Sequence, residues 1–154
     1  MNKKIVYIDM DNVLVDFPSA FPKIDKETLE KYGKDKDEIP NIFSIMEPMK
    51  GALEAFDFIA DHADTYILST APWKNPSAWS DKLLWVKKYL GDKAHKRLIL
   101  SHNKHLNRGD ILIDDRDDKN GADKFAGEFI HFGSERYPDW DAVLEYLKKI
   151  LVVQ

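Results

Sequence analysis

Asp9 and Asp11 stand two residues apart, directly after the short apolar run Ile5–Ile8. A carboxylate is an oxygen ligand of the kind that Mg²⁺ prefers, and it can attack phosphorus so that hydrolysis proceeds through an aspartyl-phosphate in two easier steps. A second carboxylate on the same turn can protonate the leaving oxygen and later activate water. Two aspartates after an apolar run are usually only a turn, so the rest of the chain decides whether these form a site.

Three further apolar runs are followed by polar side chains that suit the same chemistry. These side chains are a hydroxyl, a lysine and two carboxylates: Thr70, Lys104, Asp114 and Asp115. Asp115 can join Asp9 in binding Mg²⁺. Thr70 and Lys104 can bind phosphoryl oxygens, where negative charge must be stabilised in the transition state. Four such matches in chain order predict a single site for phosphoryl transfer.

Five short apolar runs predict β-strands, because most are continuously apolar, as is typical of strands covered on both faces. They are Ile5–Ile8, Tyr66–Leu68, Leu98–Leu100, Ile111–Ile113 and Phe129–Phe132. Helical periodicity lies between and after them, at residues 53–63, 79–90 and 140–151. This alternation predicts an α/β fold, a Rossmann-like, doubly wound parallel sheet of about five strands. Such sheets bind ligands at the carboxyl ends of their strands, where the polar side chains lie.

One segment interrupts the alternation of strands and helices. Residues 18–50 contain four prolines and a charged stretch, in which Thr28–Tyr32 has a helical pattern and Gly33 could end the helix. We expect a small helical cap of residues 18–50, inserted after the first strand of a core made of residues 1–17 and 51–154. Such a cap would open to admit a ligand and close to exclude water. The alternative is a surface loop, but long structureless loops are uncommon in compact domains.

The composition limits the class of protein. The chain has 154 residues, enough for one domain, and 44% hydrophobic with 32% charged residues is typical of a globular protein. A formal net charge of −4 argues against binding of nucleic acid polymers. The absence of cysteine excludes disulfides and thiolate metal sites. No signal peptide or membrane-spanning apolar run is present, so we expect a cytoplasmic protein.

The chain resembles the haloacid dehalogenase-like (HAD-like) phosphatases, and within them the 5'(3')-deoxyribonucleotidases. The matching strings are Asp9-Met10-Asp11-Asn12-Val13-Leu14-Val15-Asp16-Phe17, Ser69-Thr70-Ala71-Pro72, Lys104 and Leu112-Ile113-Asp114-Asp115-Arg116. The resemblance extends from residue 4 to the final helix. It implies a phosphomonoester hydrolase that depends on Mg²⁺, forms an aspartyl-phosphate and removes phosphate from (deoxy)nucleoside monophosphates, with pyrimidine nucleotides as the leading candidates.

The resemblance also implies roles for individual residues. Asp9 would be the nucleophile and a metal ligand, while Asp11 would be the acid/base and would bind the metal through its backbone carbonyl. Asp115, eleven residues after Lys104, matches the third protein ligand of the metal, although Asp114 and Asp115 could exchange roles. Thr70 and Lys104 would bind the phosphate.

Further residues are implied around the rest of the substrate. Phe17 matches an aromatic side chain that packs near the nucleoside, and Lys74 could also reach the phosphate. Asn12 departs from the glycine that is common at its position in relatives. Individual residues of the cap do not match particular positions of the family's base-binding pocket. The candidates for the walls of that pocket, which could equally be packing residues, are Phe43, Met46 and Trp73.

Two other functions remain open. A HAD-like phosphatase of another small phosphorylated metabolite would need hydrogen bonds in its cap more than an aromatic surface. A phospho-acceptor switch resembling response-regulator receivers is disfavoured, because their aspartate ends a middle strand and here Asp9 ends the first.

Two metal sites are also disfavoured: residues 110–118 fail the spacing of an EF-hand loop, and His102 and His105 lack further zinc ligands at matching spacing.

Overall fold

A five-stranded parallel sheet forms the centre of the computed structural model, which describes residues 2–152. In spatial order its strands are β5 (Leu98–Leu100), β4 (Asp64–Ser69), β1 (Ile5–Ile8), β6 (Ile111–Asp114) and β7 (Glu128–His131). The central strand β1 pairs with β4 and β6, and Tyr7 lies in register with Tyr66 and Leu112. The predicted α/β fold with a parallel sheet and an insertion after the first strand is therefore confirmed.

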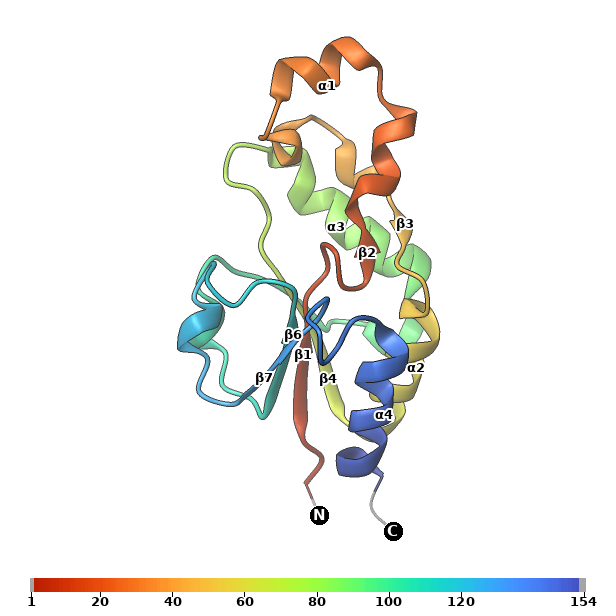
Figure 1. Ribbon diagram of the computed structural model, residues 1–154, viewed down its shortest axis with the longest axis vertical. Coiled ribbons are helices and arrows are strands. Elements are labelled where there is room, and N and C mark those ends of the chain that lie inside the picture. Colours follow the sequence, from red (N-terminus) through yellow and green to blue (C-terminus); the bar gives the residue numbers. More distant parts are fainter. Residues whose placement is uncertain (1, 153–154) are drawn as a thin grey trace.

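The two faces of the sheet are covered differently (Figure 1). Helices α2 (Ala52–His62) and α4 (Trp140–Leu151) pack on the face that holds the larger hydrophobic core. On the other face, Tyr7 and Leu112 belong to a smaller core beneath the short 3₁₀ helix η6 (Ala122–Lys124). Outside the segment between β1 and α2, two further 3₁₀ helices are η4 (Gly91–Ala94) and η5 (Lys104–Leu106). The segments that follow β5 and β6 are mostly irregular, and they place polar residues at the carboxyl ends of the strands.

The segment between β1 and α2 rises above the carboxyl ends of the strands (Figure 1). An antiparallel pair, β2 (Val15–Asp16) with β3 (Glu47–Pro48), marks where the chain leaves and rejoins the core. Between them lie η1 (Phe17–Lys23), α1 (Lys26–Tyr32), η2 (Lys36–Glu38) and η3 (Ile42–Ser44). We call residues 18–50 the cap. Their division from a core of residues 1–17 and 51–154 remains a proposal, and residues 1, 153 and 154 of that core lie outside the described part of the chain.

Helix α3 (Pro76–Tyr89) holds the cap to the core. The side-chain amide of Asn75, the residue before the helix, donates to the carbonyls of Asp37 and Ile39 at 2.9 and 3.0 Å. Farther along, the indole N–H of Trp85 donates to the carbonyl of Met46 at 3.1 Å. These bonds join α3 to the cap at two places, so the helix and the cap are expected to move together.

The buried face of α3 differs from the apolar stripe that predicted the helix. Trp79 and Leu83 in that stripe are 37% and 42% exposed. The helix instead buries Ala78, Asp81, Lys82, Trp85 and Val86. The predicted helix is real, but two charged residues lie on its buried side because that side faces the cap and the polar ends of the strands.

Trp140 is buried at the start of α4 and bonds to the turn that follows β1. Its side chain is 1% exposed, and its indole N–H donates to the backbone carbonyl of Val13 at 2.8 Å. Trp140→Ala should lower the free energy of unfolding by about 3–5 kcal/mol, because it leaves a cavity and an unpaired carbonyl. Urea denaturation measures the loss. Trp73→Ala, at a position that is 80% exposed, is the control, and equal losses for the two variants would contradict the prediction.

Candidate active site

The turn after β1 carries Asp9 and Asp11. The backbone N–H of Asp9 still bonds to β6, at 2.9 Å, so the residue is fixed by the sheet. The carbonyl of Met10 then accepts the N–H groups of residues 13–15 at 2.9 to 3.0 Å, which closes a tight turn. Asn12 lies in the left-handed region at φ 61, which asparagine and glycine tolerate better than most residues. This conformation explains how asparagine can replace the glycine that is common in relatives.

Asp9, Asp114 and Asp115 form an acidic cluster at the carboxyl ends of β1 and β6. Each offers a carboxylate oxygen, and these oxygens all lie within 4.8 Å of one another. Lys104 is 3% exposed and donates to Asp9 at 3.0 Å and to Asp114 at 2.6 Å. Within residues 2–152, the Asp115 carboxylate has no ion pair with a basic side chain. The buried lysine thus pairs with two of the three carboxylates and leaves the third, Asp115, without a cationic partner among the described residues.

The electrostatics of the cluster follow from burial and from like charges. Burial by itself would lower the pKa of Lys104, but the charges of Asp9 and Asp114 outweigh it and raise that pKa above its usual range. Burial, and next the charge of Asp9, raise the pKa of Asp114 and of Asp115 above the ordinary aspartate value. The cluster therefore lacks positive charge, which a divalent cation with a preference for oxygen ligands can supply. The residues present fit Mg²⁺.

Asp114 and Asp115 differ in their partners. Asp114 accepts from Lys104 with one oxygen and from the backbone N–H of Arg116, at 3.1 Å, with the other. The backbone carbonyl of Asp115 lies 2.9 Å from Nε2 of His131, while its carboxylate stays free of a cationic partner among the described residues. This difference favours Asp115 as a metal ligand and Asp114 as the residue that orients Lys104.

Lys82 is a charged residue of the site that sequence reasoning missed. It is fully buried on α3, and its ammonium lies 3.1 and 3.2 Å from the two carboxylate oxygens of Asp11 and 2.9 Å from Oγ of Ser69. Burial raises the pKa of Asp11, and Lys82 partly offsets the effect. The overlooked signal is its spacing, since Lys82 precedes Trp85 by three residues and Val86 by four, on the same face of the helix.

A cavity of about 640 Å³ lies between the cap and the acidic cluster. The predicted site residues that line it are Asp9, Asp11, Phe17, Thr70, Lys104 and Asp115. Lys74 is exposed and lies outside this lining. The hydroxyl of Thr70 donates to the carbonyl of Ser101 at 2.8 Å, so it must rotate to donate to a phosphate oxygen.

Aromatic side chains also line the cavity. Phe17 and Phe21 contact each other edge to face at 5.7 Å, and Trp73 lies 5.8 Å from the ring of His102. Of the candidate walls from the cap and its surroundings, only Trp73 is in the lining. Phe43 and Met46 are instead buried against α3, at 3% and 2% exposure. Residues 34–37 of the cap, which the sequence did not single out, also reach the cavity.

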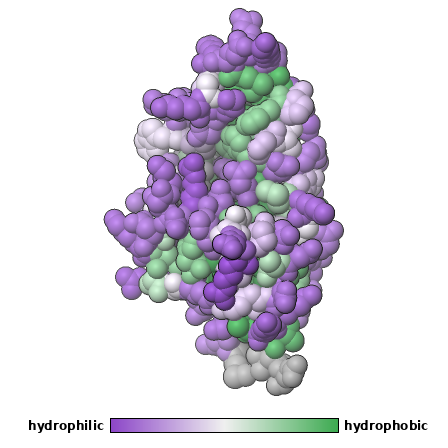
Figure 2. Space-filling model, in the orientation of Figure 1, coloured by the Kyte–Doolittle hydropathy of each residue, from purple (hydrophilic) through white to green (hydrophobic). Residues whose placement is uncertain are grey.

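The surface around the cap is mixed in character. Apolar residues form a patch in the upper part of the molecule, below a hydrophilic tip, and the middle of this face is largely hydrophilic (Figure 2). The hydrophilic part is consistent with the charged residues that line the cavity, among them Lys36, Arg116 and Lys119. A phosphorylated ligand would therefore meet a polar entrance.

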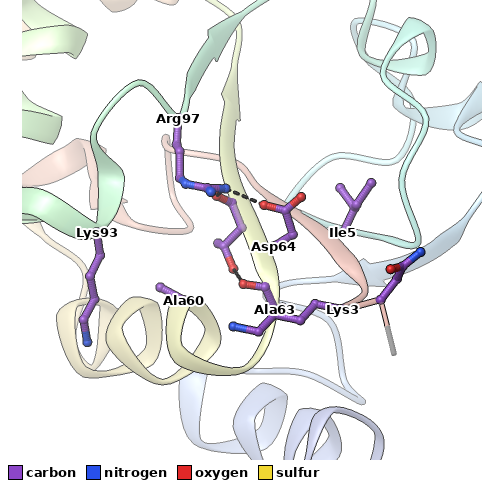
Figure 3. Close-up of a pocket in the computed structure, with 9 residues that line it drawn as sticks. Lys3, Ile5, Ala60, Ala63, Asp64, Lys93 and Arg97 are labelled. Atoms are coloured by element: carbon purple, nitrogen blue, oxygen red, sulfur yellow. Dashed lines mark hydrogen bonds and ion pairs between the residues drawn. The ribbon is translucent and has the colours of Figure 1, made fainter.

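A second cavity, of about 550 Å³, lies where the strands begin, at the opposite edge of the sheet (Figure 3). Its basic residues include Lys93 and Arg97. Arg97 donates to Asp64 at 2.5 Å, and Lys93 pairs with two aspartates of α2 at 2.9 and 3.3 Å. Because these charges are paired and the acidic cluster lies at the other edge, the first cavity is the candidate active site.

The sequence is similar to those of proteins with assigned functions. Residues 25–141 match the family model described as "5' nucleotidase, deoxy (Pyrimidine), cytosolic type C protein". A protein of Vibrio phage KVP40, provisionally named a 5'(3')-deoxyribonucleotidase, is 58% identical over 146 residues, which cover 95% of this chain and 85% of that protein. The human mitochondrial 5'(3')-deoxyribonucleotidase is 30% identical in an alignment of 168 positions, gaps included, that covers 90% of this chain and 68% of that protein.

A solved structure extends the similarity to the fold. The HAD domain of the effector protein Lem4 from Legionella pneumophila, an inactive mutant, superposes with a TM-score of 0.50 over 98% of this chain and 95% of that one. The two sequences are 12% identical, so this likeness concerns the fold alone.

The fold is that of a HAD domain, with an acidic cluster at the carboxyl ends of β1 and β6. The family model and the similar sequences identify the family. The chain belongs to the 5'(3')-deoxyribonucleotidase family, as its motifs predicted. Within residues 2–152, no helix combines the length and apolar character needed to cross a membrane. A cytoplasmic location stays a prediction, since one human relative is mitochondrial.

Proposed function

We propose that this protein is a Mg²⁺-dependent hydrolase that removes phosphate from deoxyribonucleoside monophosphates through an aspartyl-phosphate at Asp9. The observation that carries the proposal is the position of Asp9, buried beside Lys104 and Asp115 in the wall of a cavity of about 640 Å³. That volume lies within the range of small-molecule sites. Membership of the 5'(3')-deoxyribonucleotidase family supports the substrate class.

The first chemical step transfers the phosphoryl group to Asp9. A carboxylate oxygen of Asp9 attacks the phosphorus, and a P–O bond to Asp9 forms while the bond to the nucleoside oxygen breaks. Asp11 donates a proton to that oxygen, so the nucleoside leaves as an alcohol. The raised pKa of Asp11, caused by its burial, favours the protonated form that this step requires.

The second step regenerates the enzyme. Water attacks the phosphorus of the aspartyl-phosphate, and Asp11 accepts a proton from that water. The bond between phosphorus and Asp9 breaks, inorganic phosphate leaves, and both aspartates return to their starting forms. The same side chain therefore serves as the acid in one step and as the base in the next.

The remaining residues would bind the metal ion and the phosphate group and offset their charges. Asp9, Asp115 and the backbone carbonyl of Asp11 would hold Mg²⁺, which when bound offsets the repulsion between the carboxylates and the anionic phosphate. Lys104 and Thr70 would bind the phosphoryl oxygens. Lys74, predicted as another phosphate ligand, would have to move toward the cavity from its exposed position to take part.

The cap side of the cavity suits a nucleoside. Phe17 and Trp73 offer aromatic surface for the faces of a base, and the polar residues 34–37 could bond to its edges. A pyrimidine base is favoured by the description of the matching family. The second candidate, a phosphatase of another small metabolite, draws support from the charged lining, which also suits the hydroxyl groups of a sugar phosphate.

A substrate panel tests the proposed function. The purified protein with Mg²⁺ is assayed for phosphate release from 5'- and 3'-monophosphates of deoxyribonucleosides and ribonucleosides, and from sugar phosphates of similar size. We expect turnover of the deoxyribonucleotides. Turnover of sugar phosphates alone would replace the nucleotidase function by the second candidate, and no release from any ester would contradict a phosphatase.

A further inference from the structure

Lys82 is the second buried lysine of the site, and hydrogen-bond acceptors surround its ammonium group. Its ammonium group has three N–H donors. The two oxygens of Asp11 and the hydroxyl of Ser69 lie within 3.2 Å of it. The ring of Phe43, from the cap, covers it at 4.4 Å from the ring centroid. An ammonium buried without such partners would be strongly destabilising, so this arrangement fixes both the lysine and the carboxylate that it meets.

The two buried lysines form ion pairs with different carboxylates. Lys104 bonds to Asp9 and Asp114 and lines the cavity, where it can meet the phosphate. Lys82 bonds to Asp11 and does not line the cavity. A phosphate group in the cavity would therefore reach Lys104 but not Lys82, so any effect of Lys82 on the reaction has to pass through Asp11.

Asp11 requires such a partner, because its own turn leaves the carboxylate partly free. Its side chain is 29% exposed, and Lys82 is its ion-pair partner among the described residues. A proton donor acts efficiently only when it is held within hydrogen-bond reach of the leaving oxygen. Orientation of this kind is lost when a carboxylate can rotate freely.

We propose that Lys82 is a positioning residue for the acid/base Asp11, held in place by Ser69 on strand β4 and by Phe43 of the cap. The inference rests on the proposed function. It also connects the cap to the chemistry, since Phe43 keeps water from the ammonium and so preserves the pair with Asp11. A purely structural ion pair that fastens α3 to the core is the competing explanation, and the experiment separates the two.

Lys82→Met keeps the length of the side chain and removes its charge. For a deoxyribonucleoside monophosphate we expect kcat/KM and kcat to fall about 100-fold, with KM changed by less than about 3-fold. Lys87→Met, at an exposed lysine of the same helix, is the matched control and should keep the wild-type rate. Thermal melting of all variants shows whether they are folded. If Lys82→Met does not fold, Lys82→Gln, which keeps a donor for Ser69 but no charge, takes its place.

The leaving group reveals whether the loss passes through the acid. With 4-nitrophenyl phosphate the leaving oxygen departs without a proton, so kcat/KM of the Lys82 variant should fall by only about 10-fold or less. Because kcat/KM includes only the steps up to formation of the aspartyl-phosphate, its later hydrolysis does not enter. Equal losses on the two esters would overturn the positioning role and leave the structural explanation.

The outcomes also separate this inference from the proposed function. Wild-type protein that releases phosphate from neither ester overturns the proposed function, and the role of Lys82 with it. Active wild-type protein with equal losses overturns the role of Lys82 alone. A loss that is at least about ten times greater for the nucleotide than for 4-nitrophenyl phosphate supports it.

Discussion

Asp9→Asn should lower the rate of phosphate release by roughly 10⁴-fold or more, which is the scale of loss when a covalent nucleophile is removed. The amide that replaces the carboxylate is a poor nucleophile, and it also removes a negative charge from the proposed metal site. Asp9 lies 3.0 Å from Lys104 and is 6% exposed, so an asparagine of the same shape can keep the packing. Steady-state phosphate release with a deoxyribonucleoside monophosphate measures the effect.

Trapping the intermediate makes this test specific. Acid quenching of wild-type protein during turnover of a ³²P-labelled substrate should leave label on the protein, and Asp9→Asn should leave none. Asp118→Asn, an exposed aspartate in the loop after β6, is the matched control and should retain both label and activity. Robust turnover by Asp9→Asn would contradict the covalent mechanism, even if the substrate class proved correct.

Asp115→Asn should stabilise the metal-free protein and abolish its response to Mg²⁺. The acidic oxygens of Asp9, Asp114 and Asp115 lie within 4.8 Å of one another. At an effective dielectric constant near 20, one such repulsion amounts to about 3 kcal/mol, and partial exposure reduces it to roughly 2 kcal/mol. Above about pH 8, where Asp115 is ionised in the folded protein, removal of this repulsion should raise the melting temperature in EDTA by about 4–8 °C.

Mg²⁺ should stabilise the wild-type protein much more than it stabilises Asp115→Asn. In the wild-type protein, Mg²⁺ at about 100 times its dissociation constant should add about 2.7 kcal/mol to the free energy of unfolding. In Asp115→Asn most of this gain should vanish, together with activity. Asp118→Asn again serves as the control. A full response to Mg²⁺ in Asp115→Asn would assign the direct ligand to Asp114 instead.

The same cluster predicts how the stability of the metal-free protein depends on pH. Burial, and next the charge of Asp9, raise the pKa of Asp115 from 3.8 to about 8 in the folded protein. Between these values the folded state holds a proton that the unfolded state has lost, so stability falls as pH rises through this window. In EDTA, the melting temperature should therefore fall between about pH 5 and about pH 8 more steeply for the wild-type protein than for Asp115→Asn. Parallel curves would contradict this origin of the dependence.

The sequence was sufficient for the parts of this protein that depend on local pattern. Each predicted strand is present in the sheet, because a short, mostly apolar run of three or four residues between polar loops is typical of a strand covered on both faces. The helix at residues 140–151 is present with its predicted apolar face, and Asp139 caps it by accepting from the N–H of Ala142 at 3.0 Å. The family could be identified for a similar reason, since its motifs are short strings at the ends of strands.

Local pattern was less informative about the cap and its contacts. Phe43 and Met46 could not be distinguished as pocket walls or packing residues, because both uses require the same apolar side chains. The structure places them against α3 and leaves Phe17 and Trp73 in the lining of the cavity. Only the path of the chain between β2 and β3 decides which apolar surface faces the substrate.

Asp9 and Asp11 were therefore evident from the sequence, as were Thr70, Lys104 and the aspartates after β6, because parallel strands bring their carboxyl ends to one edge. Lys82 was not evident, since its partner Asp11 is 71 residues away in the chain. Ion pairs of this kind depend on how α3 packs beneath the cap, and no periodicity within the helix specifies what its buried face will meet. The sequence by itself singled out Asp9 and Asp11 for the proposed chemistry, whereas the tertiary structure decided which buried lysine contacts Asp9 and which contacts Asp11.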